Sequence, residues 1–332
     1  MSVSSTAGDA AAGPVDTTDR VAPQTTLALS IAEGKWLLRH PVLLAGAALG
    51  ALLSIQPWLA GEPAQDWETQ NYLTFLLGWA PLYFAALGTA NLAALRERET
   101  TTAEMFRSCP TRYNQRTLAL LSAGLVPTAL AAVLAAIQLR VIAKAGGITV
   151  GDRLVRLTPT VVEMALVPAT TAAAFACGVA LARTVRSRAF GAILAAVATY
   201  MFFAGFWLFG WFPAYFVTPY ATSLRSLDLG ENLTVEERTN TGALGAPIYD
   251  IGTGHWSVLV RDVAIVGWHI TYLIGLALLL TAYAIWRSGH DRRIRWLLLP
   301  GAVLAIGGLA LHMATLGGPF AWWELVHGLE GL

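Results

Sequence analysis

Three ionisable residues stand inside long apolar runs of the sequence, where a charge is costly and so points to a role. Glu163 and His269 each follow the start of a run by about five or six residues, and His312 precedes the end of another by about four. At a rise of about 1.5 Å per residue, the three side chains reach a similar depth in the outer half of a bilayer. They either snorkel to the surface or, as Glu163 with one histidine, form a polar patch that gates release at an outward exit. A metal site is disfavoured, because no two such ligands are spaced i, i+4 on one helix face.

The sequence contains none of the short motifs that carry common catalytic chemistry. There is no G-x-x-x-x-G-K-[ST] phosphate loop, no H-E-x-x-H, no C-x-x-C and no G-x-S-x-G. The six histidines are scattered along the chain. We therefore expect that any energy source is another subunit or an ion gradient.

A charged stretch between two apolar runs, residues 96–116, offers a contact for a partner protein. It holds five arginines, and such an excess places a loop in the cytoplasm. Thr101-x-x-Glu104 has the form of a capping box, and Pro110 ends any helix about two turns later. The pattern predicts a short helix over Thr102–Ser108 that presents Met105 and Phe106 to a socket on a cytoplasmic partner.

The composition defines the class of protein. The chain has 332 residues, of which 55% are hydrophobic and only 13% are charged, whereas soluble domains carry about 25% charged residues. The net charge of +1 gives no case for nucleic-acid binding. We expect an all-α, polytopic helical membrane protein with membrane lipid around it. Seven apolar runs are long enough to cross a bilayer, at about 41–60, 71–95, 117–140, 158–182, 189–211, 263–286 and 297–316.

The distribution of basic residues predicts the topology. With the N-terminus inside, cytoplasmic segments hold 14 Lys and Arg residues and the opposite segments hold 7. The positive-inside rule therefore predicts a multi-pass protein of the cell membrane with a cytoplasmic N-terminus. The segment 297–316 contains Pro300 and His312, so the prediction is six to seven spans.

Three further segments complete the predicted architecture. Residues 1–24 are polar and rich in Ala, Gly and Thr, which is typical of a disordered tail. Leu27 to Arg39 reads as an interfacial helix on the cytoplasmic surface. Between the fifth and sixth spans, the apolar segments 213–221 and 254–260 predict two short half-buried helices that dip into the outer leaflet.

Two other groups of residues are candidates for function. Tyr200, Phe203 and Phe206 lie deeper than an interfacial aromatic belt requires, so they either line a cavity for an apolar or amphiphilic substrate or pack between helices. With Glu163 and His269 they form the candidate substrate pathway. Gly46-x-x-x-Gly50 in the first span is a helix-packing pattern and a candidate contact with a second copy.

The arrangement resembles the membrane subunit of a type-2 ABC exporter, the ABC-2 type permease family. The resemblance rests on the N-terminal segment AEGKWLLRHP, the charged run RERETTTAEMFRSCPTR, the two half-buried outer segments and the absence of a fused ATPase. It covers residues 25–286, the expected exporter transmembrane domain. Members usually have six spans, so residues 287–332, an extra span and short outer tail, lie outside it.

The resemblance implies how such a chain would work. It implies a permease that pairs with a second permease and with two separate ATPase subunits, which hold ATP and Mg, while this chain binds no cofactor. The cytoplasmic helix would couple ATPase closure to expulsion of substrate. The residues that match this coupling helix by position are Thr101, Thr102, Glu104, Met105 and Phe106. The competing hypotheses are an ion-coupled transporter, an intramembrane enzyme and a structural or signalling membrane protein.

Overall fold

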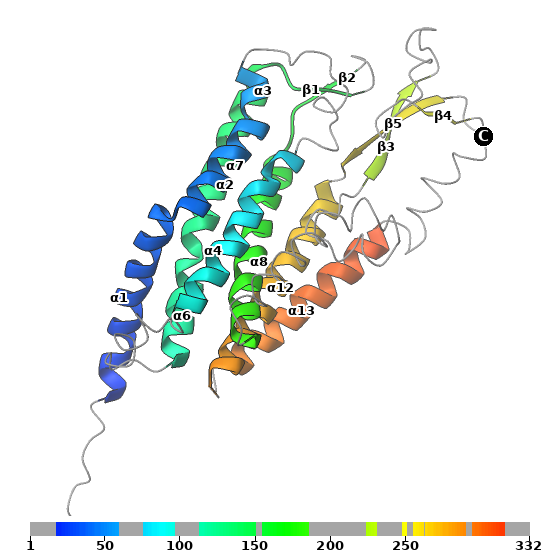
Figure 1. Ribbon diagram of the computed structural model, residues 1–332. Coiled ribbons are helices and arrows are strands. Elements are labelled where there is room, and N and C mark those ends of the chain that lie inside the picture. The colour runs from blue at the N-terminus through cyan, green and yellow to red at the C-terminus, as the bar shows by residue number, and fades with distance from the viewer. Residues whose placement is uncertain are drawn as a thin grey trace, which may run out of the picture.

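The fold was analysed in a computed structural model of the chain, which describes residues 18–59, 76–96, 113–150, 155–185, 224–230, 248–250, 255–261, 263–289 and 294–315. These residues form a tilted bundle of helices with short strands at one end (Figure 1). The helices are α1 (Thr18–Arg39), α2 (Pro41–Ser54), α3 (Gln56–Leu59), α4 (Ala80–Arg96), α6 (Tyr113–Ala123), α7 (Leu125–Lys144), α8 (Val161–Thr184), α12 (Val263–Ser288) and α13 (Ile294–Thr315), with a 3₁₀ turn, η1, at Leu77–Trp79.

The apolar helices identify a multi-pass membrane protein. Within the described residues, four helical segments are long and apolar enough to cross a membrane: Tyr113–Lys144, Val161–Thr184, Val263–Ser288 and Ile294–Thr315. A fifth is present if α1 and α2 together form one bent span. The helical membrane class is thus confirmed, whereas six to seven spans remain a prediction, because the run at 189–211 lies outside the described residues.

The junction between α1 and α2 is a sharp bend of 56°. Pro41 is the first residue of α2, and His40 before it has an extended backbone with φ −74° and ψ 122°. Proline disfavours the helical conformation in the residue that precedes it, so one continuous helix cannot form here. At its other end α1 begins at Thr18, so the last seven residues of the segment expected to be a disordered tail are helical.

Close backbone contacts hold the helices of the bundle together. Gly178 of α8 lies against α4, where a Cβ at this position would come 2.2 Å from the Leu87 carbonyl oxygen. The buried Asn91 side chain of α4 donates to the Gly178 carbonyl oxygen at 3.2 Å. These contacts place α8 at the centre of the bundle, between α4 and α12 (Figure 1).

The glycines of the first span pack within the subunit. A Cβ on Gly46 would meet Ala85 and the Pro81 carbonyl oxygen of α4, and one on Gly50 would meet the Trp79 ring. Both glycines are buried. Within the subunit, Gly46 and Gly50 thus permit close approach to α4 and η1. Their role as contacts to a second permease stays a prediction.

The last two helices, α12 and α13, pack along each other through glycines on both sides. A Cβ on Gly275 would lie 2.2 Å from the Ala305 nitrogen, and one on Gly308 would lie 2.6 Å from the Tyr272 nitrogen. The C-terminal apolar run is therefore a helix that belongs to the bundle.

Short antiparallel strands lie at the end of the bundle away from α1 (Figure 1). Strands β1 (Ile148–Val150) and β2 (Val155–Leu157) pair with each other, and β3 (Leu224–Gly230), β5 (His255–Arg261) and β4 (Ile248–Asp250) form a sheet in that order. The prediction of a half-buried helix over 254–260 is wrong, because this segment forms β5. Its alternating Trp256, Val258 and Val260 have the two-residue period of a strand. Its predicted companion, 213–221, lies outside the described residues.

Candidate functional site

The candidate site is the base of the bundle, where the two ends of the 97–112 loop join the helices. The predicted coupling residues Thr101, Thr102, Glu104, Met105 and Phe106 lie outside the described residues. The aromatic candidates Tyr200, Phe203 and Phe206 also lie outside them. The structure does describe the residue on each side of the loop, Arg96 and Tyr113, and both make specific contacts.

At the start of the loop, Arg96 binds α1. Its Nη2 lies 2.5 Å from Glu33 Oε1, with both side chains largely buried. Its guanidinium also stands over the Trp36 ring, 4.7 Å from the ring centroid, which adds a cation–π contact. A partly buried pair that also has an aromatic contact is held more firmly than an exposed salt bridge. The last residue of α4 is thus fixed to α1.

His40 completes this contact at the junction of α1 and α2, before the first apolar run. Its ring lies 4.5 Å from the Trp36 ring, centroid to centroid. Burial, and then the positive charge of Arg96, lower the pKa of His40 below its usual 6.5. His40 is therefore neutral at pH 7. The charges of this contact are the Arg96 cation and the Glu33 anion, which balance each other.

At the end of the loop, Tyr113 binds α8. Nη1 of Arg183 donates to the Tyr113 hydroxyl oxygen at 2.6 Å, and the guanidinium lies 4.3 Å from the Tyr113 ring centroid. The same nitrogen is 3.4 Å from the Ala94 carbonyl oxygen of α4. Arg183 is buried in the last turn of α8, where the helix dipole also favours a cation. The first residue of α6 is thus fixed to α8 by a buried charge.

The same end of α6 also contacts α12. The Thr117 and Ser288 hydroxyls are 2.7 Å apart, so one of them donates to the other. The hydroxyl that accepts can use its own proton for the carbonyl one turn earlier in its helix, Tyr113 for Thr117 or Ala284 for Ser288. The two ends of the loop therefore reach different parts of the bundle: Arg96 reaches α1, and Tyr113 with Thr117 reaches α8 and α12. A displacement of the loop would act on both parts.

Glu163 is a helix cap in this structure. Its backbone N–H donates to the Thr160 hydroxyl oxygen at 3.2 Å, while the Thr160 backbone N–H donates to Glu163 Oε2 at 2.6 Å. This reciprocal pair is the capping box that begins α8. The Glu163 side chain is fully buried, so it does not snorkel to the surface as one of our two expectations had it.

We expect the Glu163 side chain to stabilise α8 through its oxygen acceptor more than through its charge. Glu163→Ala removes the acceptor and should lower the free energy of unfolding by about 1 kcal/mol. Glu163→Gln keeps an acceptor at the third helical position and should lose less than half as much. Thermal unfolding of the purified protein in detergent measures both. Equal losses in the two variants would show that the charge, and not the cap, is what matters.

The structure places His269 and His312 side by side. Their ring centroids are 5.4 Å apart in an edge-to-face arrangement, and Tyr272 lies 5.6 Å from His269. Both histidines are fully buried between α12 and α13. The structure thus adds His312, which was not among the residues predicted for the substrate pathway, as the neighbour of His269.

A buried polar network at the other end of the bundle was not predicted. Trp79 Nε1 donates to Gln138 Oε1 at 2.7 Å, and Gln138 Nε2 donates to the Ser54 carbonyl oxygen at 3.0 Å. The network joins η1, α7 and the end of α2. The available signal was the uncharged amide at position 138 inside an apolar run, since a buried polar group in a span needs a partner.

Comparison with known proteins adds no relative: no family model matches the chain, and no curated protein matches it.

Proposed function

We propose that this chain is the transmembrane permease subunit of an ATP-driven exporter and moves its substrate outward. A separate ATPase supplies the energy and holds ATP and Mg, so the working complex has two ATPase subunits and a second permease. The complex lies in the cell membrane with the N-terminus of this chain in the cytoplasm. The observation that supports the proposal is the anchoring of both ends of the 97–112 loop, because a coupling element must transmit force to the helices.

In this proposal the loop transmits motion by two routes. The ATPase contacts Thr101, Thr102, Glu104, Met105 and Phe106 and displaces the short helix when ATP closes the ATPase pair. Arg96 passes the displacement to Glu33 and Trp36 on α1. Tyr113 passes it to Arg183 on α8. The candidate pathway residues Tyr200, Phe203, Phe206 and His269 belong to the substrate route of the same proposal.

Met105→Asp combined with Phe106→Asp should reduce co-purification of the ATPase at least tenfold. Two buried carboxylates in an apolar contact are strongly unfavourable. The measurement uses the full-length chain co-expressed with its neighbouring genes, and it follows a phosphate-loop ATPase in the eluate. Thr111→Asp, in the same loop but beyond Pro110, is the control and should leave the ATPase bound. Undiminished co-purification of the double variant, with normal membrane insertion, would contradict the proposal.

An ion-coupled transporter is the second candidate, and the buried pair His269 and His312 favours it. Histidines buried between helices are typical of proton pathways in transporters. Transport into inverted vesicles separates the two candidates. ATP-dependent uptake that survives a protonophore supports the exporter, whereas uptake that a protonophore abolishes and ATP does not drive supports the ion-coupled transporter.

A further inference from the structure

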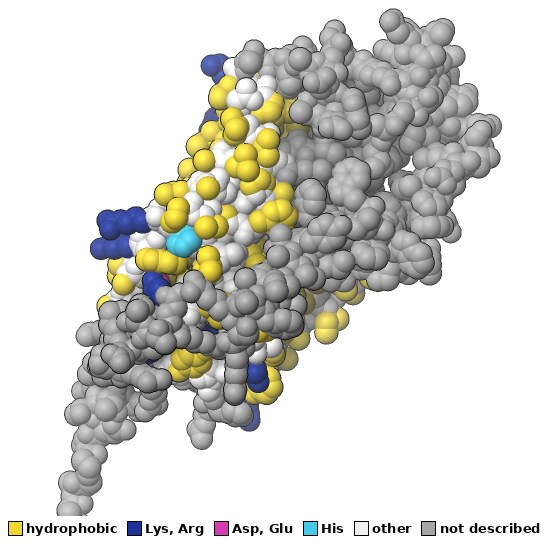
Figure 2. Space-filling view, in the orientation of Figure 1, with side chains coloured by type: hydrophobic (Ala, Val, Ile, Leu, Met, Phe, Trp, Pro, Cys, Tyr) yellow, Lys and Arg dark blue, Asp and Glu magenta, His cyan; other side chains and the backbone are white. Residues whose placement is uncertain are grey.

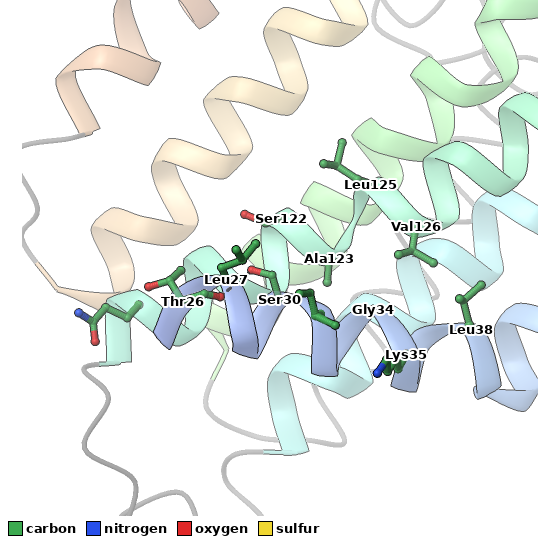
Figure 3. A pocket seen from close by; sticks show the side chains of 12 residues that line it. Thr26, Leu27, Ser30, Gly34, Lys35, Leu38, Ser122, Ala123, Leu125 and Val126 are labelled. Carbon is green, nitrogen blue, oxygen red and sulfur yellow. Dashed lines mark hydrogen bonds between the residues drawn. The ribbon is translucent and has the colours of Figure 1, made fainter. Parts of the chain in front are cut away.

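A groove runs along the surface of the bundle where α1 packs against the α6–α7 helix pair (Figure 3). Its volume is about 640 Å³, within the range of small-molecule sites. The two walls meet where Gly34 faces Val126, since a Cβ on Gly34 would come 3.1 Å from a Val126 methyl group. The apolar side chains along it are Leu27, Ile31, Leu38, Ala123, Leu125 and Val126.

The interior of the groove suits a hydrocarbon chain. The Ser30 hydroxyl donates to the Thr26 carbonyl oxygen at 2.8 Å, so this polar group of the wall is already satisfied within α1. At the rim, Leu27 is 62% exposed and Leu125 is 71% exposed. Such an open apolar lining next to a spanning helix is stable when lipid, and not water, covers it.

Two exposed cations of α1 lie at one end of the groove. Lys35 lines it, and Arg39 follows one turn later; both are exposed. Neither makes an ion pair within the described part of the chain, where the α1 carboxylate Glu33 binds Arg96 instead. Figure 2 shows Lys and Arg side chains at the edge of the hydrophobic surface in the orientation of Figure 1.

We propose that this groove binds an anionic phospholipid of the surrounding membrane. One acyl chain lies between α1 and the α6–α7 pair, and the phosphate lies against Lys35 and Arg39. The two cations favour a lipid with an anionic headgroup. The apolar walls of the groove favour a ligand with an acyl chain. A second copy of this protein fits less well, because a symmetric contact through the same face would bring like charges together.

Native mass spectrometry of the full-length chain in mild detergent, titrated with palmitoyl-oleoyl phosphatidylglycerol, tests the proposal. Lys35→Gln with Arg39→Gln should weaken the tightest lipid site about twenty-fivefold, since each basic side chain near an anionic lipid contributes about fivefold. Lys144→Gln, an exposed cation at the far end of α7, is the control and should retain the site.

A second variant fills the groove without changing its charge. Ser122 is exposed and lines the groove, so Ser122→Phe should fold and should also weaken the site, whereas Val133→Phe on an exposed part of α7 should not. Unchanged binding in both groove variants would overturn the proposal. Equal binding of phosphatidylcholine by the wild type would also overturn it. So would efficient disulfide crosslinking between copies carrying Ile31→Cys, because a second copy would then occupy the groove.

Discussion

Gly178→Ala is expected to destabilise the protein by at least about 3 kcal/mol, an overpacking loss at the upper end of the usual range. The new methyl group would lie 2.2 Å from the Leu87 carbonyl oxygen and 2.9 Å from the Ala90 Cβ. Backbone cannot yield as a flexible side chain can, so α4 and α8 must move apart. That movement would also stretch the Asn91 hydrogen bond to the Gly178 carbonyl.

Gly88→Ala provides the matched control for this prediction. Gly88 lies in α4 near the same contact, but a Cβ there meets no atom within 4 Å. Because alanine is the better helix former by about 1 kcal/mol, Gly88→Ala should be neutral or slightly stabilising. Thermal unfolding in detergent, followed by loss of the monodisperse peak, measures both. Similar stability of the two variants would mean that α4 and α8 do not approach as closely as the structure shows.

Arg183→Met should release the start of α6 from the bundle. Arg183 combines a charge-assisted hydrogen bond, worth about 1.5–3 kcal/mol, with a cation–π contact of about 2 kcal/mol when desolvated. Both go to Tyr113. Methionine fills a similar volume without charge, so the protein should fold while amide hydrogen exchange over residues 113–123 rises at least tenfold.

Conservative variants distinguish the parts of this contact. Tyr113→Phe keeps the ring but loses the hydroxyl acceptor, and Arg183→Lys keeps the charge but loses the guanidinium fork; each should raise exchange by an intermediate amount. Arg287→Met, an exposed arginine at the end of α12, is the control. If exchange in α6 is the same in Arg183→Met and the wild type, Arg183 does not anchor the loop.

The sequence predicts the long apolar helices best, because hydropathy alone determines where they lie. The runs expected at 263–286 and 297–316 correspond to Val263–Ser288 and Ile294–Thr315, because a long apolar segment leaves the backbone no alternative to a helix. The segment 254–260 is apolar enough to predict a half-buried helix, but the two-residue spacing of Trp256, Val258 and Val260 is that of a strand. Its strand pairs with the neighbouring β4 and with β3, which lies farther away along the chain.

Contacts between helices were harder to predict than the helices. The Gly46-x-x-x-Gly50 pattern indicates close approach but not whether the partner is another copy or another helix of the same chain. The sequence identifies Arg183 only as a cytoplasmic cation, because no local pattern indicates its contact with Tyr113. The cap of α8 was readable, because Thr160-Val-Val-Glu163 has the same form as the Thr101 pattern that was recognised.

The glycine contacts between α12 and α13 bear on how the protein is made. Gly275 and Gly308 bring the backbones of the last two helices together, so each helix supplies the surface that covers the other. During synthesis α12 emerges first and stays without that cover until α13 has left the ribosome. The two helices are therefore best inserted as a hairpin, and their mutual packing forms only after α13 has emerged.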